Sequence, residues 1–245
     1  MARIFITGSA DGLGQLAAKE LIAQGYQVVL HARNKSRAQD AVYEAPGGES
    51  IVTGDLSSID ETKQLALQVN ALGKFDAVIH NAGIYGGLPE DIFAVNTLAP
   101  YVLTCLIEKP KRLIYLSSGL HKGGRFQVES FKQNGSSITY ADSKLHVLML
   151  AKAIARKCPG IHANAVNPGW VPTKMGGSGA PDDLEKGYQT QVWLASSHDD
   201  RAKVSGQYFY YKQATKSSPS ADDVSLQEKF IRLCEEITGV SFECG

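Results

Sequence analysis

The first 31 residues constrain the fold of this chain more than any other stretch. A short apolar run, Arg3-Ile-Phe-Ile, breaks into glycines at positions 8, 12 and 14, and a helical apolar pattern follows as far as Leu21. A second apolar run, Gln27 to His31, arrives one helix later, which is the spacing of a βαβ unit. Glycines at such a turn let the backbone approach a pyrophosphate, whose charge is met by the free N–H groups of the helix. The opening therefore predicts a nucleotide site, the alternative being an ordinary strand-to-helix turn.

Apolar runs and helical patterns alternate along the rest of the chain. The expected strands centre on residues 5, 29, 51, 78, 114, 165 and 209, and the expected helices cover 13–24, 35–45, 58–72, 90–107, 138–157, 181–196 and 222–237. This alternation indicates a parallel sheet with helices on both faces. We predict an α/β fold, a single doubly wound Rossmann domain over residues 1–245 with a seven-stranded parallel sheet. Ser220 and Asp223 are spaced like a capping box for the last helix, and Gly239 follows its end.

Composition excludes several classes of function. The 245 residues carry 25 basic and 25 acidic side chains, so the formal charge is zero and nothing predicts binding to nucleic acid or an acidic membrane. With no signal peptide before the first strand and no long apolar run, we expect a cytoplasmic protein without a membrane span. Four cysteines, at 105, 158, 234 and 244, lack a CxxC spacing, which favours reduced thiols over a disulfide or metal site. The histidines form no ligand cluster, so we predict no metal.

Tyr140 and Lys144 are one helical turn apart, so a phenol and an ammonium are expected to share one helix face. A phenol titrates near pH ~10, and a neighbouring cation favours the phenolate and lowers the pKa toward neutrality. Tyr208 and Lys212 have the same spacing, but the aromatic run after Gly206 predicts a strand. On a strand the two side chains would lie roughly 13 Å apart, at about 3.3 Å per residue.

Ligands on a doubly wound sheet bind at the carboxyl ends of the strands, so the residues after each expected strand are informative. In chain order these segments are Thr7 to Gly14, Asp55-Leu56, Asn81-Ala-Gly83, Asn96, Ser117-Ser118, Tyr140 to Lys144 and Asn167-Pro-Gly169. Together they resemble the classical short-chain dehydrogenase/reductase family over essentially the whole chain. The segments Ser-Ser-Gly-Leu-His121, Asn-Pro-Gly-Trp-Val-Pro-Thr173 and Gly-Gln-Tyr-Phe are similar to its retinol-dehydrogenase-like branch.

The resemblance implies an oxidoreductase that moves a hydride between a nicotinamide and a carbonyl or alcohol. Tyr140 would be the general acid or base, Lys144 would hold the nicotinamide ribose, and Ser118 would donate to the substrate oxygen. Ser118 is favoured over Ser117 because the family places the acting serine second, and adjacent strand residues face opposite ways. Asn96 would anchor a water that relays protons toward Lys144, its alternative being a helix-terminus cap.

The same resemblance implies the residues that contact the cofactor. Asp55 would bind the adenine amine, and Thr173 the nicotinamide carboxamide or the pyrophosphate. The full set of expected cofactor residues is Gly8, Ser9, Asp11, Gly12, Leu13, Gly14, Arg33, Asp55, Leu56, Asn81, Ala82, Gly83, Tyr140, Lys144, Pro168, Gly169, Val171 and Thr173.

The end of the second expected strand bears on the choice between NADP(H) and NAD(H). Proteins that use NAD commonly place an acid at this position to bind both ribose hydroxyls. This chain has Ala32 there, followed by Arg33, whose guanidinium suits a 2′-phosphate. Lys35 and Arg37 add positive charge, although they also suit a solvated first helical turn. Asp11 opposes NADP(H) binding if its carboxylate repels the phosphate. The alternative is that Asp11 simply caps the following helix. We predict NADP(H).

The substrate is expected to be small, a carbonyl compound or an alcohol. Lys174 begins a glycine-rich segment, about 174–187, that is predicted to be a mobile lid. Trp170, Met175, Tyr85 and Ile84 are candidate walls of an apolar pocket, which favours an apolar ketone or aldehyde. Residues 119–139 are expected to form a flap at the rim of the site. His121, in this flap, is expected to be a surface or packing residue.

Two other classes of function are open to a chain with this turn. A sugar-nucleotide epimerase would show T-G-x-x-G-x-x-G and a longer substrate domain, and neither is present. A non-catalytic NADP(H)-sensing or interaction protein of the same fold is the alternative, although it would lose the tyrosine or the lysine. The helix over 138–157 has apolar residues on more than one face, which makes a homodimer possible.

Overall fold

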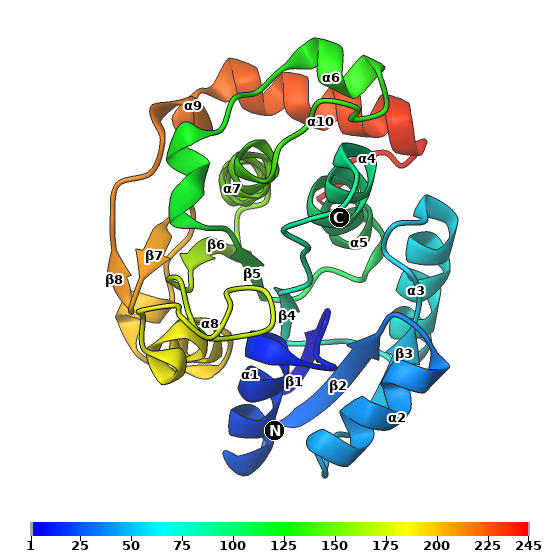
Figure 1. Ribbon diagram of the computed structural model, residues 1–245, viewed down its shortest axis with the longest axis vertical. Helices are drawn as coiled ribbons and strands as arrows, with labels where there is room; N and C mark the ends of the chain where they lie inside the picture. Colours follow the sequence, from blue (N-terminus) through cyan, green and yellow to red (C-terminus); the bar gives the residue numbers. More distant parts are fainter. Residues whose placement is uncertain (1, 245) are drawn as a thin grey trace.

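A single sheet lies at the centre of the computed structural model, which describes residues 2–244 (Figure 1). Its strands are β1 (Arg3–Ile6), β2 (Gln27–Ala32), β3 (Ser50–Thr53), β4 (Ala77–His80), β5 (Arg112–Leu116), β6 (His162–Asn167), β7 (Tyr208–Tyr210) and β8 (Gln213–Ala214). Their order is β3-β2-β1-β4-β5-β6-β7-β8, and the first seven strands in the chain pair in parallel. The strand order reverses between β1 and β4, so the loops that follow these two strands diverge there.

The seven parallel strands confirm the predicted doubly wound α/β fold, and one further strand was not predicted. The β8 strand pairs antiparallel with β7 and has only two residues. Tyr211 and Lys212 connect them with φ angles of 49° and 61°, as a tight two-residue hairpin turn requires. The strand expected across Tyr208 to Lys212 therefore ends at Tyr210, where the chain turns back.

Helices cover both faces of the sheet. They are α1 (Gly12–Ala23), α2 (Lys35–Glu44), α3 (Ile59–Ala71), α4 (Pro89–Phe93), α5 (Ala99–Leu106), α6 (Val128–Lys132), α7 (Tyr140–Lys157), α8 (Leu184–Ser196), α9 (Pro219–Asp222) and α10 (Val224–Thr238). One apolar cluster joins α1, α2 and α8 to one face of the sheet, and a larger cluster joins α3, α5 and α7 to the other face. The helix expected over 90–107 is interrupted by a π-helical turn, Ala94–Leu98.

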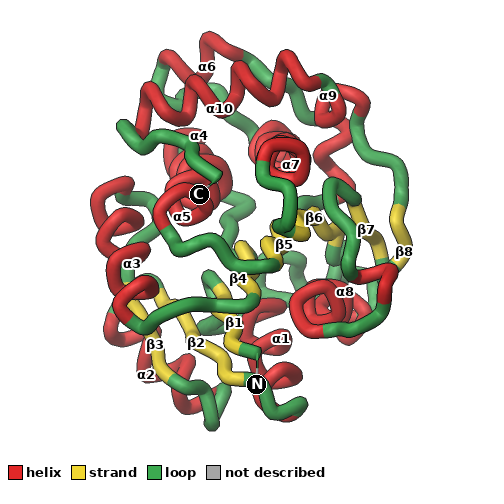
Figure 2. The backbone as a smooth tube through the Cα atoms, turned by 180° about the vertical axis from the view of Figure 1, so that it is seen from behind, coloured by secondary structure: helices red, strands yellow, loops and turns green. Residues whose placement is uncertain are grey.

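An outer layer covers the larger cluster. The α10 helix crosses over α7, with α6 alongside it, in both views of the molecule (Figures 1 and 2). Phe230 of α10 packs on Phe131 of α6, with ring centres 6.0 Å apart, and Phe131 packs on His146 of α7 at 5.0 Å. The apolar excess of α7 is therefore covered within the chain. The homodimer stays a prediction without support from this helix.

The start of α10 differs from the expectation, whereas its end agrees. Ser220 lies inside α9, so the predicted capping box of Ser220 and Asp223 is wrong. Asp223 itself caps α10, because its carboxylate accepts the N–H of Leu226 at 3.0 Å. Gly239 ends the helix in the left-handed conformation, with a φ of 65°, as predicted.

The expectation of four reduced cysteines is wrong. Cys158, at the end of α7, forms a disulfide with Cys244, which follows α10, and their Cα atoms are 5.3 Å apart. Cys105 and Cys234 have free thiols. The pair is separated by 86 positions in the chain, so only the return of the segment after α10 toward α7 brings it together. No helix within residues 2–244 combines the length and apolarity needed to cross a membrane.

Candidate active site

The loops at the carboxyl ends of the strands enclose two adjoining cavities. The first cavity, of about 400 Å³, is lined mainly by residues 8–95, which follow β1 to β4. The second cavity, of about 610 Å³, is lined mainly by residues 118–210, which follow β5 to β7. The two cavities share five lining residues, namely Leu13, Tyr140, Pro168, Thr173 and Met175. Tyr140 therefore lies where the two cavities meet.

The glycine turn after β1 forms one wall of the first cavity. Gly8 and Gly12 have φ angles of 62° and 57°, which favour glycine. Asn81, after β4, donates from Nδ2 to the carbonyl oxygens of Thr7 and Gly8 at 3.0 and 3.1 Å. A Cβ on Gly14 would lie only 2.3 Å from that Nδ2, so Gly14 lets α1 pack against Asn81. The loops after β1 and β4 are thereby held together at the start of α1.

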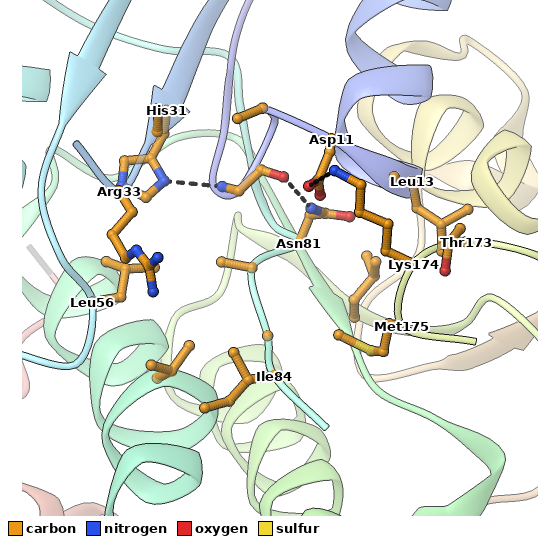
Figure 3. A pocket seen from close by; sticks show the side chains of 18 of the residues that line it. Asp11, Leu13, His31, Arg33, Leu56, Asn81, Ile84, Thr173, Lys174 and Met175 are labelled. Atoms are coloured by element: carbon orange, nitrogen blue, oxygen red, sulfur yellow. Dashed lines mark hydrogen bonds and ion pairs between the residues drawn. The ribbon is translucent and has the colours of Figure 1, made fainter. Parts of the chain in front are cut away.

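His31, at the end of β2, fixes the same turn, and this role was not predicted. The N–H of Gly8 donates to Nδ1 of His31 at 2.9 Å (Figure 3), and Nε2 lies 3.0 Å from the carbonyl oxygen of Gly54. Because Nδ1 accepts, the proton is on Nε2, which donates to Gly54. Burial lowers the pKa of His31 to about 4, so the ring is neutral at pH 7. The sequence could have indicated this role, because His31 lies at the carboxyl end of a strand, close to Arg33.

Asp11 does not cap α1 with its side chain, and its effect on a bound phosphate stays a prediction. It occupies the N-cap position of α1 by backbone, but its side chain makes no capping hydrogen bond. Its Oδ2 instead lies 2.6 Å from Nη2 of Arg37 and 3.3 Å from Nζ of Lys174. Arg37 also pairs with Asp40 at 3.0 Å, so it is not merely a solvated residue of the first turn. Two cations therefore compensate the negative charge of Asp11.

Arg33 remains available at one end of the first cavity. Its side chain is exposed and lies near Leu56, opposite the end formed by Thr173 and Met175 (Figure 3). Among residues 2–244 it has no ion-pair partner, in contrast to Arg37. A positive charge without a protein partner thus faces the cavity next to the end of β2.

Asn96 is not a helix-terminus cap. It lies in the π-helical turn, is 1% exposed, and its Oδ1 accepts the N–H of Ile84 at 2.8 Å. Its Nδ2 donates to the carbonyl oxygen of Ile84 at 2.8 Å and to Oγ of Ser143 at 3.0 Å. Asn96 therefore ties the loop after β4 to α7. A Cβ on Gly83 would lie 3.1 Å from Nζ of Lys144 and 3.3 Å from Oδ1 of Asn96. A larger residue at position 83 would therefore crowd both side chains.

The first turn of α7 sets the positions of Tyr140 and Lys144. Thr139 and Asp142 form a reciprocal capping box, so the helix begins at Tyr140. One turn later, Nζ of Lys144 lies 5.4 Å from the centre of the Tyr140 ring, as the spacing predicted. Nζ also donates to the carbonyl oxygen of Leu116 at 2.9 Å, and Lys144 is 4% exposed. The ammonium is thus held firmly at the end of β5.

The expected lowering of the tyrosine pKa is wrong for the protein alone. Burial raises the pKa of Tyr140 to about 12, and the hydroxyl of Ser118 offsets only part of this effect. Burial also lowers the pKa of Lys144 to about 8. Desolvation outweighs the attraction between the two groups, because the phenolate loses water that the distant ammonium does not replace. At pH 7 the phenol is protonated and can donate a proton.

The two serines after β5 face different surroundings. The hydroxyl of Ser117 is buried and donates to the carbonyl oxygen of Lys144 at 2.8 Å. Ser118 lines the second cavity together with Tyr140, which supports its choice over Ser117. His121 is fully buried, with Nδ1 2.6 Å from the carbonyl oxygen of Ser118 and Nε2 accepting the N–H of Ser218 at 3.1 Å. His121 is therefore a packing residue that supports the backbone of Ser118.

Most of the predicted site residues line one of the two cavities. The first cavity includes Gly8, Asp11, Gly12, Leu13, Arg33, Leu56, Asn81, Ala82, Gly83, Tyr140, Lys144, Pro168 and Thr173, and the second adds Ser118, Gly169 and Val171. Four lie outside both linings, namely Ser9, Gly14, Asp55 and Asn96. Ser9 turns inward and donates to the carbonyl oxygen of Ile6 at 3.0 Å. Asp55 accepts from the hydroxyl of Ser57 at 2.8 Å.

The predicted walls and covering segments are also located. Tyr85 and Trp170 line the second cavity, Ile84 lines the first, and Met175 lines both. Only the start of the expected flap over 119–139 lines the site, because α6 packs in the outer layer instead. The α8 helix begins at Leu184, so it includes the last residues of the expected lid. Within residues 2–244 no group of three His, Cys, Asp or Glu side chains could hold a metal ion.

Known proteins resemble this chain over its full length. A family model described as short chain dehydrogenase matches residues 2–106. An uncharacterized oxidoreductase of Emericella nidulans is 47% identical over 100% of both chains. The short-chain dehydrogenase chyC of Penicillium rubens is 43% identical over 98% of both chains. Retinol dehydrogenase 14 of Homo sapiens is 28% identical over 97% of this chain and 86% of its own.

Solved structures share the fold. An uncharacterized protein from Mycobacterium paratuberculosis superposes with a TM-score of 0.83, at 24% identity, over 99% of this chain and 95% of that one. A blue fluorescent protein from a metagenomic library, in complex with NADPH, has a TM-score of 0.70 and 25% identity, over 85% of this chain and 95% of that one. The full-length relatives show that the chain belongs to the classical short-chain dehydrogenase/reductase family, and the similarity to retinol dehydrogenase 14 agrees with the expected retinol-dehydrogenase-like branch.

Proposed function

We propose that this protein is an NADP(H)-dependent oxidoreductase that reduces an apolar ketone or aldehyde, or oxidises the corresponding alcohol. One observation carries the proposal. Tyr140 lies at the junction of two cavities, with Lys144 in the lining of the first and Ser118 in the lining of the second. A proton donor between a cofactor site and a substrate site is what carbonyl reduction requires.

The first cavity fits a dinucleotide. The side chain of Asp11 leaves the first-turn N–H groups of α1 uncapped, so they and the helix dipole can face a pyrophosphate. Arg33 lines the same cavity and has no ion-pair partner within residues 2–244, which favours the additional phosphate of NADP(H). The metagenomic relative in complex with NADPH supports this cofactor. A bound nicotinamide supplies the hydride in reduction and accepts it in oxidation.

The chain's own residues supply the proton and orient the substrate. Ser118 donates a hydrogen bond to the carbonyl oxygen, which gains negative charge as the hydride reaches the carbonyl carbon. The Tyr140 hydroxyl gives its proton to that oxygen, so the product is the alcohol and the tyrosine is left as phenolate. Lys144 stabilises that phenolate and holds the nicotinamide ribose. Asn96 keeps the loop after β4 against α7 and anchors the proton path toward Lys144.

The segment after β6 closes the proposed substrate site. Thr173 and Met175 border both cavities, so movement of this segment would admit both ligands. We propose that residues 174–183 act as a lid. Its many glycines favour such movement.

Replacement of Tyr140 by Phe tests the proposal directly. The substitution removes only the hydroxyl, so turnover of a carbonyl panel with NADPH should fall by at least roughly a hundredfold. The affinity for NADPH, measured by fluorescence titration, should stay within a few fold of the native value. Tyr43→Phe is the matched control, since Tyr43 is 84% exposed and lines neither cavity. If Tyr140→Phe keeps native turnover, the proposed mechanism is wrong.

A further inference from the structure

Exposed apolar side chains gather at the second cavity. Within residues 2–244, ten large hydrophobic side chains are exposed, and four of them, Tyr85, Leu120, Trp170 and Met175, line this one cavity. They come from three separate loops, after β4, β5 and β6. Large apolar groups that converge from separate loops without covering one another mark a place where a ligand completes the burial.

Aromatic rings form much of this lining. The ring of Tyr85 meets the edge of the Tyr140 ring, with centres 4.8 Å apart, so the aromatic wall starts at the proposed proton donor. Trp170 is held in place because its Nε1 donates to the carbonyl oxygen of Gly176 at 2.8 Å. Tyr210 stacks on Tyr211 at 4.0 Å between centres. Aromatic rings that line a cavity favour a flat aromatic ligand, which can stack on them or meet them edge to face.

Asp182 is the one formally charged side chain in this lining at neutral pH. The other polar side-chain groups are hydroxyls, the amide of Asn167 and the indole N–H of Trp170, and the lining contains no lysine, arginine or histidine. Oδ2 of Asp182 accepts the N–H of Trp170 at 2.6 Å, and the N–H of Asp182 donates to the carbonyl oxygen of Trp170 at 3.0 Å. These bonds fix the carboxylate at the wall of the cavity.

Gly169 makes room for this carboxylate. Its φ is 85°, and a Cβ there would lie 2.7 Å from Oδ2 of Asp182. The turn after β6 thus admits the carboxylate against the backbone that carries Trp170. Asp182 lies in the proposed lid, and its two hydrogen bonds to the Trp170 backbone place the carboxylate at the cavity wall in the conformation described here.

We infer that the second cavity takes a planar aromatic carbonyl compound, neutral or cationic, and that Asp182 is a specificity residue that rejects carboxylates. The inference rests on the proposed function and names the substrate class of the same site. A ligand carboxylate would meet a fixed negative charge with no cation in the lining to compensate it. A neutral ring of similar size meets only aromatic and aliphatic walls.

A matched pair of aldehydes tests this assignment. With saturating NADPH, the native enzyme should show kcat/KM for methyl 4-formylbenzoate at least tenfold above that for 4-formylbenzoate. Asp182→Asn keeps an oxygen that accepts the N–H of Trp170 but removes the charge, so the ratio should fall at least threefold. Asp223→Asn is the control. Asp223 is exposed, lies outside the lining and the lid, and caps α10 by accepting the N–H of Leu226 at 3.0 Å, which Asn can also do. Its ratio should equal the native one.

The aromatic part of the inference has its own comparison. Benzaldehyde should be a better substrate than cyclohexanecarbaldehyde by at least fivefold in kcat/KM. Equal values for these two aldehydes would overturn the aromatic assignment. A native ester-to-carboxylate ratio near one, or an unchanged ratio in Asp182→Asn, would overturn the role of Asp182.

A binding measurement separates this inference from the proposed function. Quenching of tryptophan fluorescence in the complex with NADPH should report tighter binding of benzamide than of benzoate, and Asp182→Asn should reduce the difference. If no carbonyl compound is turned over while this preference persists, the proposed function is wrong, and only the rejection of carboxylates by Asp182 stands. If turnover occurs but benzoate binds as tightly as benzamide, the inference alone fails.

Discussion

At the scale of single residues, charge pairing around the first cavity bears on the choice of cofactor. Asp11 would repel a 2′-phosphate if it were alone, but Arg37 and Lys174 lie within 2.6 and 3.3 Å of its carboxylate. Arg33 is then an uncompensated cation beside the end of β2. From the sequence, the approach of Arg37 to Asp11 could be suspected, whereas Lys174 is 163 positions away and could not.

The pair Ala32 and Arg33 is therefore expected to determine cofactor preference. Ala32→Asp combined with Arg33→Leu should weaken NADPH binding by about 2 to 4 kcal/mol and spare or improve NADH binding. The change removes a charge-assisted contact with the phosphate and adds a repulsion. Isothermal titration with both cofactors measures it. Lys216→Leu is the control, because Lys216 is exposed and lies outside both cavity linings. A native protein that binds NADH more tightly than NADPH would show that this assignment is wrong.

At the scale of secondary-structure elements, β2, β4 and α7 each bury a neutral histidine. Burial lowers the pKa of His31 to about 4, of His80 to about 3 and of His146 to about 4. His80 stacks on Tyr115 with ring centres 4.7 Å apart, and His146 lies among the phenylalanines beneath α10. None of the three rings can accept a proton in the folded state without losing a packed, dehydrated position.

These histidines should make the protein sensitive to acid. Their folded pKa values are lower than the ordinary 6.5, so the unfolded chain takes up protons first. The stabilisation is complete above pH 6.5 and is lost as the pH falls toward 4, by about 1.4 kcal/mol per pH unit for each histidine. Urea unfolding at pH 7.5, 6.5 and 5.5 should show this slope. His146→Gln should reduce it by about one proton, whereas exposed His198→Gln should not. An identical slope in His146→Gln would contradict the prediction.

The apolar periodicity of the sequence predicted the long, regular helices. It missed short elements that depend on contacts between distant parts of the chain. The bounds of α1, α2, α3, α7 and α8 agree with the expected helices within a few residues, because each has a continuous apolar face. The division of 90–107 by a π-helical turn was hidden, since it depends on the bonds of Asn96 to Ile84 and Ser143. The two-residue strand β8 is too short to leave a pattern.

At the scale of the whole molecule, the disulfide joins the end of α7 to the last described residue. It closes a loop with a sequence separation of 86, which restricts the unfolded chain and should stabilise the folded one by about 4 kcal/mol. Reduction with dithiothreitol should therefore lower Tm by roughly 10 °C. Cys244→Ser should show the low Tm with or without reductant. Free-thiol titration in denaturant should find two thiols, Cys105 and Cys234; four thiols and an unchanged Tm would contradict the bond.

The overall architecture and the site differ in how far the sequence reveals them. The glycine turn, the alternation of strands and helices and the Tyr140–Lys144 pair follow from local spacing, so they were predictable. The outer layer of α6 and α10, the disulfide and the position of Asp182 depend on segments that meet only after folding. The raised pKa of Tyr140 was likewise hidden, because burial is a property of the whole fold.

The two cavities draw mainly on different parts of the chain. The first draws most of its lining from residues 8–95 and the second from residues 118–210, with Tyr140 between them. Because only five positions line both cavities, most residues of the second lining can change without altering the first. Substitutions in the loops after β5 and β6 can therefore change which substrate is accepted while the reaction stays the same. This layout also offers the protein engineer a natural crossover point, near the end of α5, for building hybrids.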